Sequence, residues 1–296
     1  MRKSHSKAVH LSTVLFCAAF LISALPGSAL AINNGQPVQE SDWLSKSVVA
    51  IYSYNGTYES YCTGTVISES QVLTAAHCFG DPGRDPEFRS YRVLLGVDVN
   101  SARLGKPIKE KSKVPHLRIK SVTLRNTIQR LGDPDDIAVV ELTGRLPKAY
   151  APVTLPAGDE SVDGADLLIA GYGMDLAASS FVFNPIRLKS ASLTESPIPD
   201  RDLRSFFSKN PERILHVSSK DGVMGCKGDS GGPAFYKGKS GWVQMGVFHG
   251  TASKSPSPSL VPKCPAEEGY YTNLSWHSDW ILQHLIPSCT RARTSE

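Results

Sequence analysis

The stretch GDSGGP, residues 228–233, places the hydroxyl of Ser230 among glycines. Because glycine carries no side chain, a carbonyl group of another molecule can approach the backbone beside this serine closely. A serine hydroxyl is a poor nucleophile at neutral pH unless a base accepts its proton during attack. A reactive Ser230 therefore requires a base elsewhere in the chain.

Two upstream segments supply that base and a carboxylate. The segment LTAAHC (73–78) carries His77 at the end of a predicted strand, and DIAVVEL (136–142) opens another strand with Asp136. His77 can accept the serine proton, while Asp136 can hold the second imidazole nitrogen, fix the tautomer and stabilise the imidazolium. Each residue alone has an ordinary explanation, such as a loop hydroxyl or a core histidine. All three together, in the order His, Asp, Ser, favour nucleophilic catalysis.

These segments resemble those of the trypsin/chymotrypsin family of serine peptidases, in which the three groups follow the same order. The resemblance extends to IAGYG (169–173), to GYYT (269–272) and to Trp280 and Ile281 near the C-terminus. It implies an all-β fold of two antiparallel six-stranded β-barrels with a C-terminal α-helix and an active site in their seam. It also implies a serine endopeptidase, a hydrolase that cleaves peptide bonds through an acyl-enzyme intermediate.

The same resemblance assigns further residues to roles. Backbone N–H groups of Gly228 and Ser230 are expected to form the oxyanion hole. A newly made α-amino group at Ile32 is expected to pair with Asp229 and so activate the enzyme. The implied disulfides are Cys62–Cys78 and Cys226–Cys264.

The predicted specificity pocket lacks a charge at its base. In this family the residue six positions before the nucleophile lies there, and here it is Met224, with Gly250 and Gly269 on the walls. This predicts cleavage after apolar or small residues, although Glu267 or Glu268 could still supply a carboxylate.

One edge of the predicted cleft departs from the family pattern. Where the family usually has Ser-Trp-Gly, this chain has Phe248 and His249. The register leaves open whether His249 approaches Asp136 or lines the substrate cleft.

Nine short runs that alternate or are rich in β-branched residues read as strands. They are separated by clusters of Gly, Pro, Asp and Asn, which favours antiparallel all-β architecture. The runs are 48–52, 64–67, 72–74, 92–95, 137–140, 167–170, 188–191, 242–248 and 270–272. We divide the chain into a signal peptide (1–31), an N-terminal β-barrel (32–145), an interdomain connection (146–160), a C-terminal β-barrel (161–274), a C-terminal helix (275–287) and a tail (288–296).

The leading segment has the pattern of an export signal. Residues 1–10 are basic, 11–25 are apolar and small residues precede position 32. Cleavage after Ala31 would release a secreted or periplasmic protein without a membrane anchor; an uncleaved anchor is the alternative. Such cleavage would expose Ile32 directly, so we expect export itself to activate the enzyme.

Composition limits the partners. The formal net charge of +4 falls to +1 without residues 1–31, which gives no reason to expect nucleic acid. We expect protein or peptide substrates and no cofactor. Histidines are scattered and no Cys or His pair has ligand spacing, so no metal site is predicted. Five cysteines would follow the cleavage site, which leaves Cys289 over.

Two other classes of protein compete with a peptidase. A trypsin-like fold kept as a catalytically weak or inactive binding module would share the strands but not the turnover. A lipase or esterase would require the order Ser, Asp, His, which this chain does not have.

Overall fold

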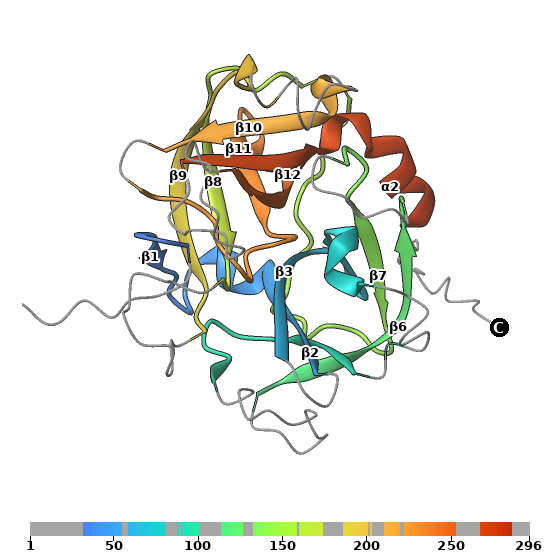
Figure 1. Cartoon of the computed structure of the whole chain (residues 1–296). Coiled ribbons are helices and arrows are strands. Elements are labelled where there is room, and N and C mark those ends of the chain that lie inside the picture. Colours follow the sequence, from blue (N-terminus) through green and yellow to red (C-terminus); the bar gives the residue numbers. More distant parts are fainter. Residues whose placement is uncertain are drawn as a thin grey trace, which may run out of the picture.

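The computed structural model describes residues 32–54, 59–80, 88, 90–100, 114–126, 133–158, 160–173, 186–200, 202, 210–219, 222–252 and 267–285. The predicted signal peptide, Cys264 and Cys289 lie outside these residues. Figure 1 shows the strands β2 to β7 (residues 48–142) in one half of the molecule and the later strands in the other, where the blue strand β1 (Gln36–Pro37) also lies. Among the described residues, no helix is both long and apolar enough to cross a membrane.

The first half is a closed antiparallel barrel. Its core comes from apolar residues that alternate along the strands, including Val49, Ile51, Leu73 and Val140. Around the barrel the strands are β2 (Val48–Tyr54), β3 (Glu59–Ser68), β4 (Gln71–Thr74), β7 (Ala138–Leu142), β6 (His116–Leu124) and β5 (Tyr91–Leu94).

The second half is also a closed ring of six antiparallel strands. Around the ring they are β8 (Asp166–Gly171), β9 (Lys189–Glu195), β10 (Ile214–Ser218), β13 (Glu268–Asn273), β12 (Gly241–Ala252) and β11 (Pro233–Gly238). The pairing of β11 with β8 closes the ring. A short strand from the start of the described chain, β1 (Gln36–Pro37), adds to β9. The expected pair of six-stranded barrels is confirmed.

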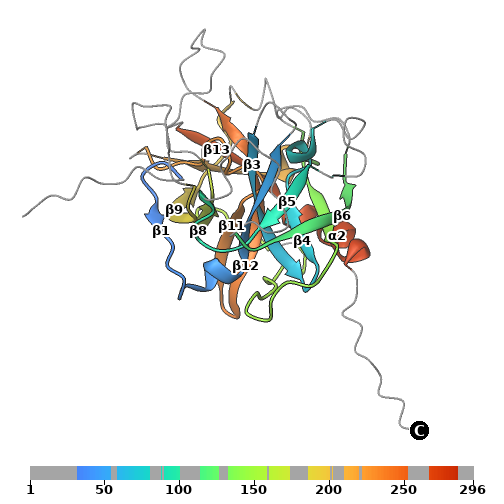
Figure 2. The same cartoon turned by 90° about the horizontal axis from the view of Figure 1, so that it is seen from below.

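The helical elements are short. The 3-10 helices are η1 (Trp43–Lys46), η2 (Ala76–Phe79), η4 (Pro211–Arg213) and η5 (Leu274–Trp276). The C-terminal helix α2 (Ser278–His284) occupies less than the expected range of 275–287, because a 3-10 turn precedes it and Leu285 is extended. Ile281 on α2 is buried in the core of the first barrel. Both views show α2 beside β6 (Figures 1 and 2), so the end of the chain returns to the first barrel.

All nine predicted runs overlap strands, but β3 begins five residues before its predicted run, and β9 and β12 each end four residues after theirs. The sequence did not predict the two-residue strand β1, nor the barrel strands β6, β10 and β11. In β6 the register shifts between Ile119 and Ser121, and such an irregularity interrupts the alternation that marks a strand. The other two are short, and β11 begins at Pro233 directly after two glycines.

The seam between the barrels is held by Thr63 on β3 and Tyr172 just after β8. Thr63 Oγ1 donates to the Gly228 carbonyl at 2.9 Å and accepts from the Tyr172 N–H at 3.0 Å. The Thr63 N–H donates to the Ser230 carbonyl at 2.7 Å. In the other direction, the Tyr172 hydroxyl donates to the Gly96 carbonyl at 2.8 Å. These bonds join the serine loop of the second barrel to the wall of the first.

Tyr172→Phe should lower the free energy of unfolding by about 1–2 kcal/mol, because the partly buried Gly96 carbonyl loses its donor. Urea denaturation measures the change. The matched control is Tyr236→Phe on β11, where the side chain is only half-buried. Equal effects of the two substitutions would contradict the role given to the Tyr172 hydroxyl.

Candidate active site

His77 and Asp136 come together on the side of the first barrel that faces the second. The 3-10 helix η2 follows β4 at once and carries His77, and Asp136 immediately precedes the strand region of β7. His77 Nδ1 lies 2.6 Å from Asp136 Oδ2, and the His77 backbone N–H donates to Asp136 Oδ1 at 2.8 Å. The Asp136 side chain is 2% exposed, whereas that of His77 is 31% exposed. Asp136 thus fixes the imidazole through Nδ1, while part of the ring remains accessible to solvent.

The charge state of Asp136 follows from these contacts. Burial alone would raise the pKa of this carboxyl. The side-chain hydrogen bond and charge of His77, the charge of His249 and the His77 backbone N–H outweigh burial and hold the pKa below its usual value of 3.8. Asp136 is therefore an anion at neutral pH, as a carboxylate that orients a histidine must be.

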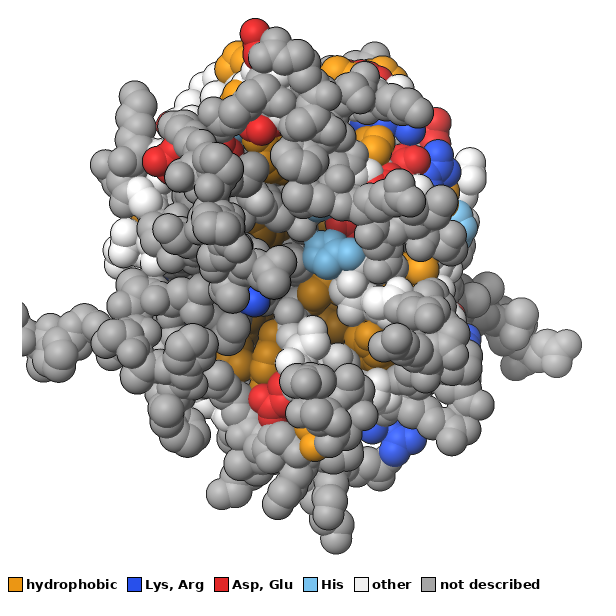
Figure 3. Space-filling view, viewed as in Figure 1, with side chains coloured by type: hydrophobic (Ala, Val, Ile, Leu, Met, Phe, Trp, Pro, Cys, Tyr) orange, Lys and Arg blue, Asp and Glu red, His pale blue; other side chains and the backbone are white. Residues whose placement is uncertain are grey.

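Ser230 lies against the histidine loop. Its carbonyl accepts from Thr63 on the first barrel and lies 3.7 Å from Cys78 Sγ, next to His77 in the chain. The residue is half-buried. On the face drawn in Figure 3, histidine surface is exposed near the centre, between acidic and hydrophobic surface. The structure thus brings the three predicted residues to one region of the seam.

The backbone before Ser230 has the conformation that glycine permits. Gly228 has φ +96°, in the left-handed region that residues with side chains rarely adopt. A Cβ atom at Gly228 would also lie 2.9 Å from the Gly173 Cα atom. Both constraints require glycine here, at the first of the two predicted oxyanion donors.

Asp229 points away from the cleft into the second barrel. Its carboxylate accepts from the Cys226 N–H at 2.8 Å, from the Gly173 N–H at 2.7 Å and from the backbone N–H of Ile32. Burial raises its pKa to about 7, although these three bonds and the positive charge of Lys189 act in the opposite direction. Side chains at Gly171 and Gly173 would collide with this carboxylate.

Ile32 is seated where the resemblance places an activating N-terminus. Its side chain is buried, and Lys189 Nζ lies 3.5 Å from its carbonyl oxygen. The neighbouring Asn33 donates from its backbone to the Met224 carbonyl at 3.0 Å and from its side chain to the Gly222 carbonyl. Lys189 was not singled out in the sequence, and its only signal is a basic residue inside an apolar strand.

Side chains fill more of the predicted specificity pocket than the sequence indicated. Met224 is fully buried, and a Cβ atom at Gly269 would lie 2.5 Å from its Sδ atom. The ring of Phe248 covers Gly225 so closely that a Cβ atom there would lie 2.7 Å from it. Gly250, also on β12, pairs with Tyr270 of β13. Phe248, which the sequence placed only at the altered edge of the cleft, thus lies over Gly225, next to Met224.

The carboxylate of Glu268 is not placed to charge this pocket. Glu268 is buried, and its Oε2 atom lies 2.7 Å from His216 Nε2. Glu267 is exposed, and its carbonyl accepts from the Ser219 N–H. The carboxylate of Glu268 is therefore committed to a histidine rather than to substrate.

The predicted disulfides are tested in part. Cys62 and Cys78 are bonded, which closes the histidine loop. Cys226 is also in a disulfide, and Cys264, its implied partner, lies outside the described residues. Cys62, His77 and Cys78 form a close group of potential metal ligands, but both sulfur atoms are oxidised and cannot act as thiolates.

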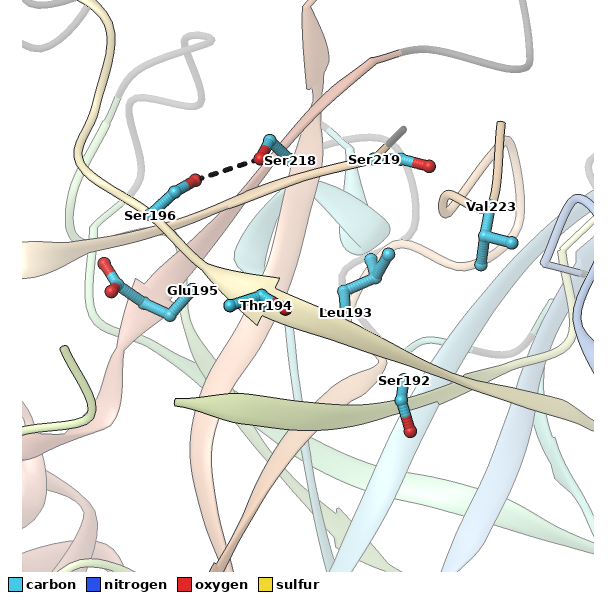
Figure 4. A pocket seen from close by; sticks show the side chains of 8 residues that line it. All are labelled: Ser192, Leu193, Thr194, Glu195, Ser196, Ser218, Ser219 and Val223. Atoms are coloured by element: carbon cyan, nitrogen blue, oxygen red, sulfur yellow. Dashed lines mark hydrogen bonds between the residues drawn. The ribbon is translucent and has the colours of Figure 1, made fainter. Parts of the chain in front are cut away.

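A separate hollow of about 370 Å³ lies at the ends of β9 and β10, and Figure 4 shows its lining. Hydroxyl side chains dominate it, and the Ser196 and Ser218 hydroxyls are hydrogen-bonded at 3.3 Å. It contains none of the predicted catalytic residues. The residues around it are Ser192, Leu193, Thr194, Glu195, Ser196, Ser218, Ser219 and Val223.

Two closed β-barrels with a histidine–carboxylate pair and a glycine-bordered serine at their seam define a serine endopeptidase. The family model described as Trypsin matches residues 32–281, and the chain belongs to this family.

Named relatives agree with that class. The chain is 29% identical to thrombin-like enzyme AhV_TL-I of Gloydius halys over 83% of this chain and 92% of the relative. It is 29% identical to thrombin-like enzyme calobin-1 of Gloydius ussuriensis, over 83% and 84% respectively. A mouse (Mus musculus) tryptase is 25% identical over 90% of this chain and 94% of its own length.

Proposed function

We propose that the protein is an exported endopeptidase in which Ser230 is the nucleophile, His77 the general base and Asp136 the carboxylate that orients it. The observation that carries the proposal is the 2.6 Å contact of His77 Nδ1 with a buried carboxylate, beside the Ser230 loop. Nδ1 of the ring is thereby engaged by Asp136, which leaves Nε2 to accept the proton of the serine.

The reaction proceeds in two halves. His77 takes the Ser230 proton as Oγ attacks the substrate carbonyl, and then gives that proton to the leaving amine. In the second half the same ring takes a proton from water as the water attacks the acyl carbon, and it returns that proton to Ser230 Oγ as the acyl–oxygen bond breaks. The backbone N–H groups of Gly228 and Ser230 stabilise the oxyanion in both halves, and each such donor contributes roughly 100- to 1000-fold in rate.

The substrate class is protein or peptide with a small apolar residue before the scissile bond. The buried Met224 and the ring of Phe248 reduce the space, and the site offers no carboxylate from Glu268. These contacts favour the smaller end of the apolar or small range expected from sequence.

Export and activation are coupled in this proposal. The leading segment has a signal-peptide pattern, and a Cys62–Cys78 disulfide suits an oxidising compartment. Ile32 already occupies a buried site at Asp229, where its nitrogen donates as a backbone amide. Cleavage before Ile32 would place an ammonium group at that position and supply the buried carboxylate with a full counter-charge.

A phosphonylating active-site reagent should label the matured chain once, on Ser230, with labelling detected by mass spectrometry. Ser230→Ala should abolish the adduct, and His77→Ala should slow its formation at least a thousandfold because the proton acceptor is lost. Ser192→Ala is the matched control, since this serine is exposed on the same barrel. An unlabelled wild-type chain would instead support an inactive binding module.

Maturation should change how stability depends on pH. In the unprocessed chain the Asp229 pKa is raised to about 7, so the folded state binds its proton more tightly than the unfolded state. Below about pH 4 this protonated carboxyl contributes fully to the free energy of unfolding. That contribution, up to roughly 4 kcal/mol, should be lost as pH rises towards 7. In the processed chain the Ile32 ammonium compensates the carboxylate, so urea denaturation should show a smaller loss.

Activity should depend on the protonation of the Ile32 α-amino group. A paired amine has a pKa above the ordinary value of about 8, so activity should fall only at alkaline pH, as the amine deprotonates. Acetylation of Ile32 should abolish the difference in stability and reduce activity at all pH values. Active enzyme whose N-terminal sequence begins well upstream of Ile32 would contradict the coupling.

Phe248→Val should enlarge the pocket and shift the preferred residue before the scissile bond from small to larger apolar side chains. We expect at least about a tenfold change in relative kcat/KM between such substrates, which is in the range of one or two methylene groups. Profiling on a mixed peptide library measures it, with Val223→Ala as control. Preference of the wild type for Arg or Lys would contradict the role of Met224.

A further inference from the structure

His249 occupies an irregular position in the second barrel. On β12, Phe248 pairs with Tyr271 and Gly250 pairs with Tyr270, so His249 is the extra residue of a bulge. A bulge redirects a side chain out of the normal alternation. Here the redirected side chain crosses the seam towards the first barrel, and only 5% of it is exposed.

The ring of His249 reaches the carboxylate that orients the catalytic histidine. His249 Nδ1 lies 3.5 Å from Asp136 Oδ2, the same oxygen atom that His77 Nδ1 contacts at 2.6 Å. The two imidazole rings are 5.9 Å apart between centroids. Asp136 Oδ2 is therefore faced by two histidines, one from each barrel, and His77 holds the shorter contact.

We propose that His249 is a positioning residue of the peptidase: when its buried ring takes up a proton, it draws the Asp136 carboxylate away from His77. The proposal rests on the proposed function, because it concerns the same Asp136 and His77. A serine or threonine hydroxyl at this position could donate to the Asp136 carboxylate, but unlike an imidazole it could not gain or lose a proton near neutral pH.

The number of acceptors around the ring supports two states. Besides facing Asp136, the ring donates to the backbone carbonyl of Asp133. A neutral imidazole has one N–H group and an imidazolium has two. With one N–H group the ring donates to the Asp133 carbonyl and leaves Asp136 Oδ2 to His77. With two N–H groups it can donate to both acceptors, and the 3.5 Å separation from Asp136 Oδ2 can shorten to a charge-assisted hydrogen bond.

The surroundings favour the neutral ring at neutral pH. Burial lowers the pKa of His249, and the charge of His77 lowers it further, while Asp136 and the Asp133 carbonyl oppose the shift. Protonation of His249 thus belongs to the acidic range. In that state His249 takes Asp136 Oδ2 from His77, and we expect the enzyme to be inactive.

Other titratable groups around the ring do not supply this behaviour. Asp133 is bound by the Asn126 amide and by the Asp135 N–H, and burial raises its pKa. Asp135 pairs with Arg213. On β13, the strand beside β12, burial keeps Tyr271 neutral, and the Tyr270 hydroxyl donates to Asp202.

The test is the acid limb of the kcat/KM profile of the matured chain between pH 4 and 8. Because activity requires both rings to be neutral, the logarithmic slope should approach two below both pKa values. Wild-type kcat/KM should then fall about a hundredfold per pH unit. In His249→Gln, whose amide donates without titrating, it should fall about tenfold. His116→Gln, at a half-buried histidine on β6, should retain the slope of two.

A slope of one in wild type, or a slope of two that survives in His249→Gln, would overturn the proposal. Because the substitution could impair folding, a second measurement uses the Ser230→Ala chain with isotope-labelled histidine. NMR should show the His249 and His77 ring resonances each responding to the titration of the other. A His249 resonance that does not shift between pH 4 and 8, or that shifts without affecting His77, would also overturn it.

The NMR titration tests the coupling of His249 and His77 separately from the proposed peptidase function. If the wild-type chain showed no turnover, the proposed function would fail. The coupling of the two rings through Asp136 would still be decided by the NMR titration.

Discussion

The buried carboxylate of Asp229 is the constraint on which the rest of the site depends. A charge inside a β-barrel is costly unless donors or a counter-charge surround it. Here three backbone N–H groups, from Ile32, Gly173 and Cys226, converge on it, with Lys189 nearby. Because these donors come from three separate segments, satisfying one side chain fixes the start of the chain, the end of β8 and the serine loop together.

The orientation of the serine loop is a direct result. With Asp229 turned inwards, Gly228 is held in the left-handed region and its carbonyl is bound by Thr63 of the other barrel. Ser230 is bound by the same threonine. The loop therefore has one anchor in each barrel. His249 makes the complementary crossing, from a bulge in the second barrel to Asp136 in the first.

The strands could be predicted because they depend on local patterns, and alternating apolar runs predicted nine of them. The arrangement of two barrels, and Ser230 as the candidate nucleophile, came from the resemblance of short motifs such as GDSGGP to those of a family. The strand β6 was missed because a register shift breaks its alternation. The placement of His249 could not be decided either, since a one-residue bulge determines which way its side chain points.

The roles of other residues could not be predicted because they depend on three-dimensional contacts. Phe248 matters because its ring covers Gly225, and Lys189 because its strand passes beside Asp229. Residue type alone marks neither one. Thr63 gives even less signal, since a threonine in a strand is ordinary. The metric details of a pocket thus depend on pairings between distant segments, which a single sequence does not display.

The site that receives Ile32 is built from the far end of the chain. The first barrel has all its strands once residue 142 has been made, whereas the second needs β13, which ends at Asn273. Met224 and Asp229, which bind Asn33 and Ile32, belong to that later part. During synthesis the segment at residues 32–33 therefore cannot reach its docked position until residue 229, about two hundred residues further along the chain, has been made.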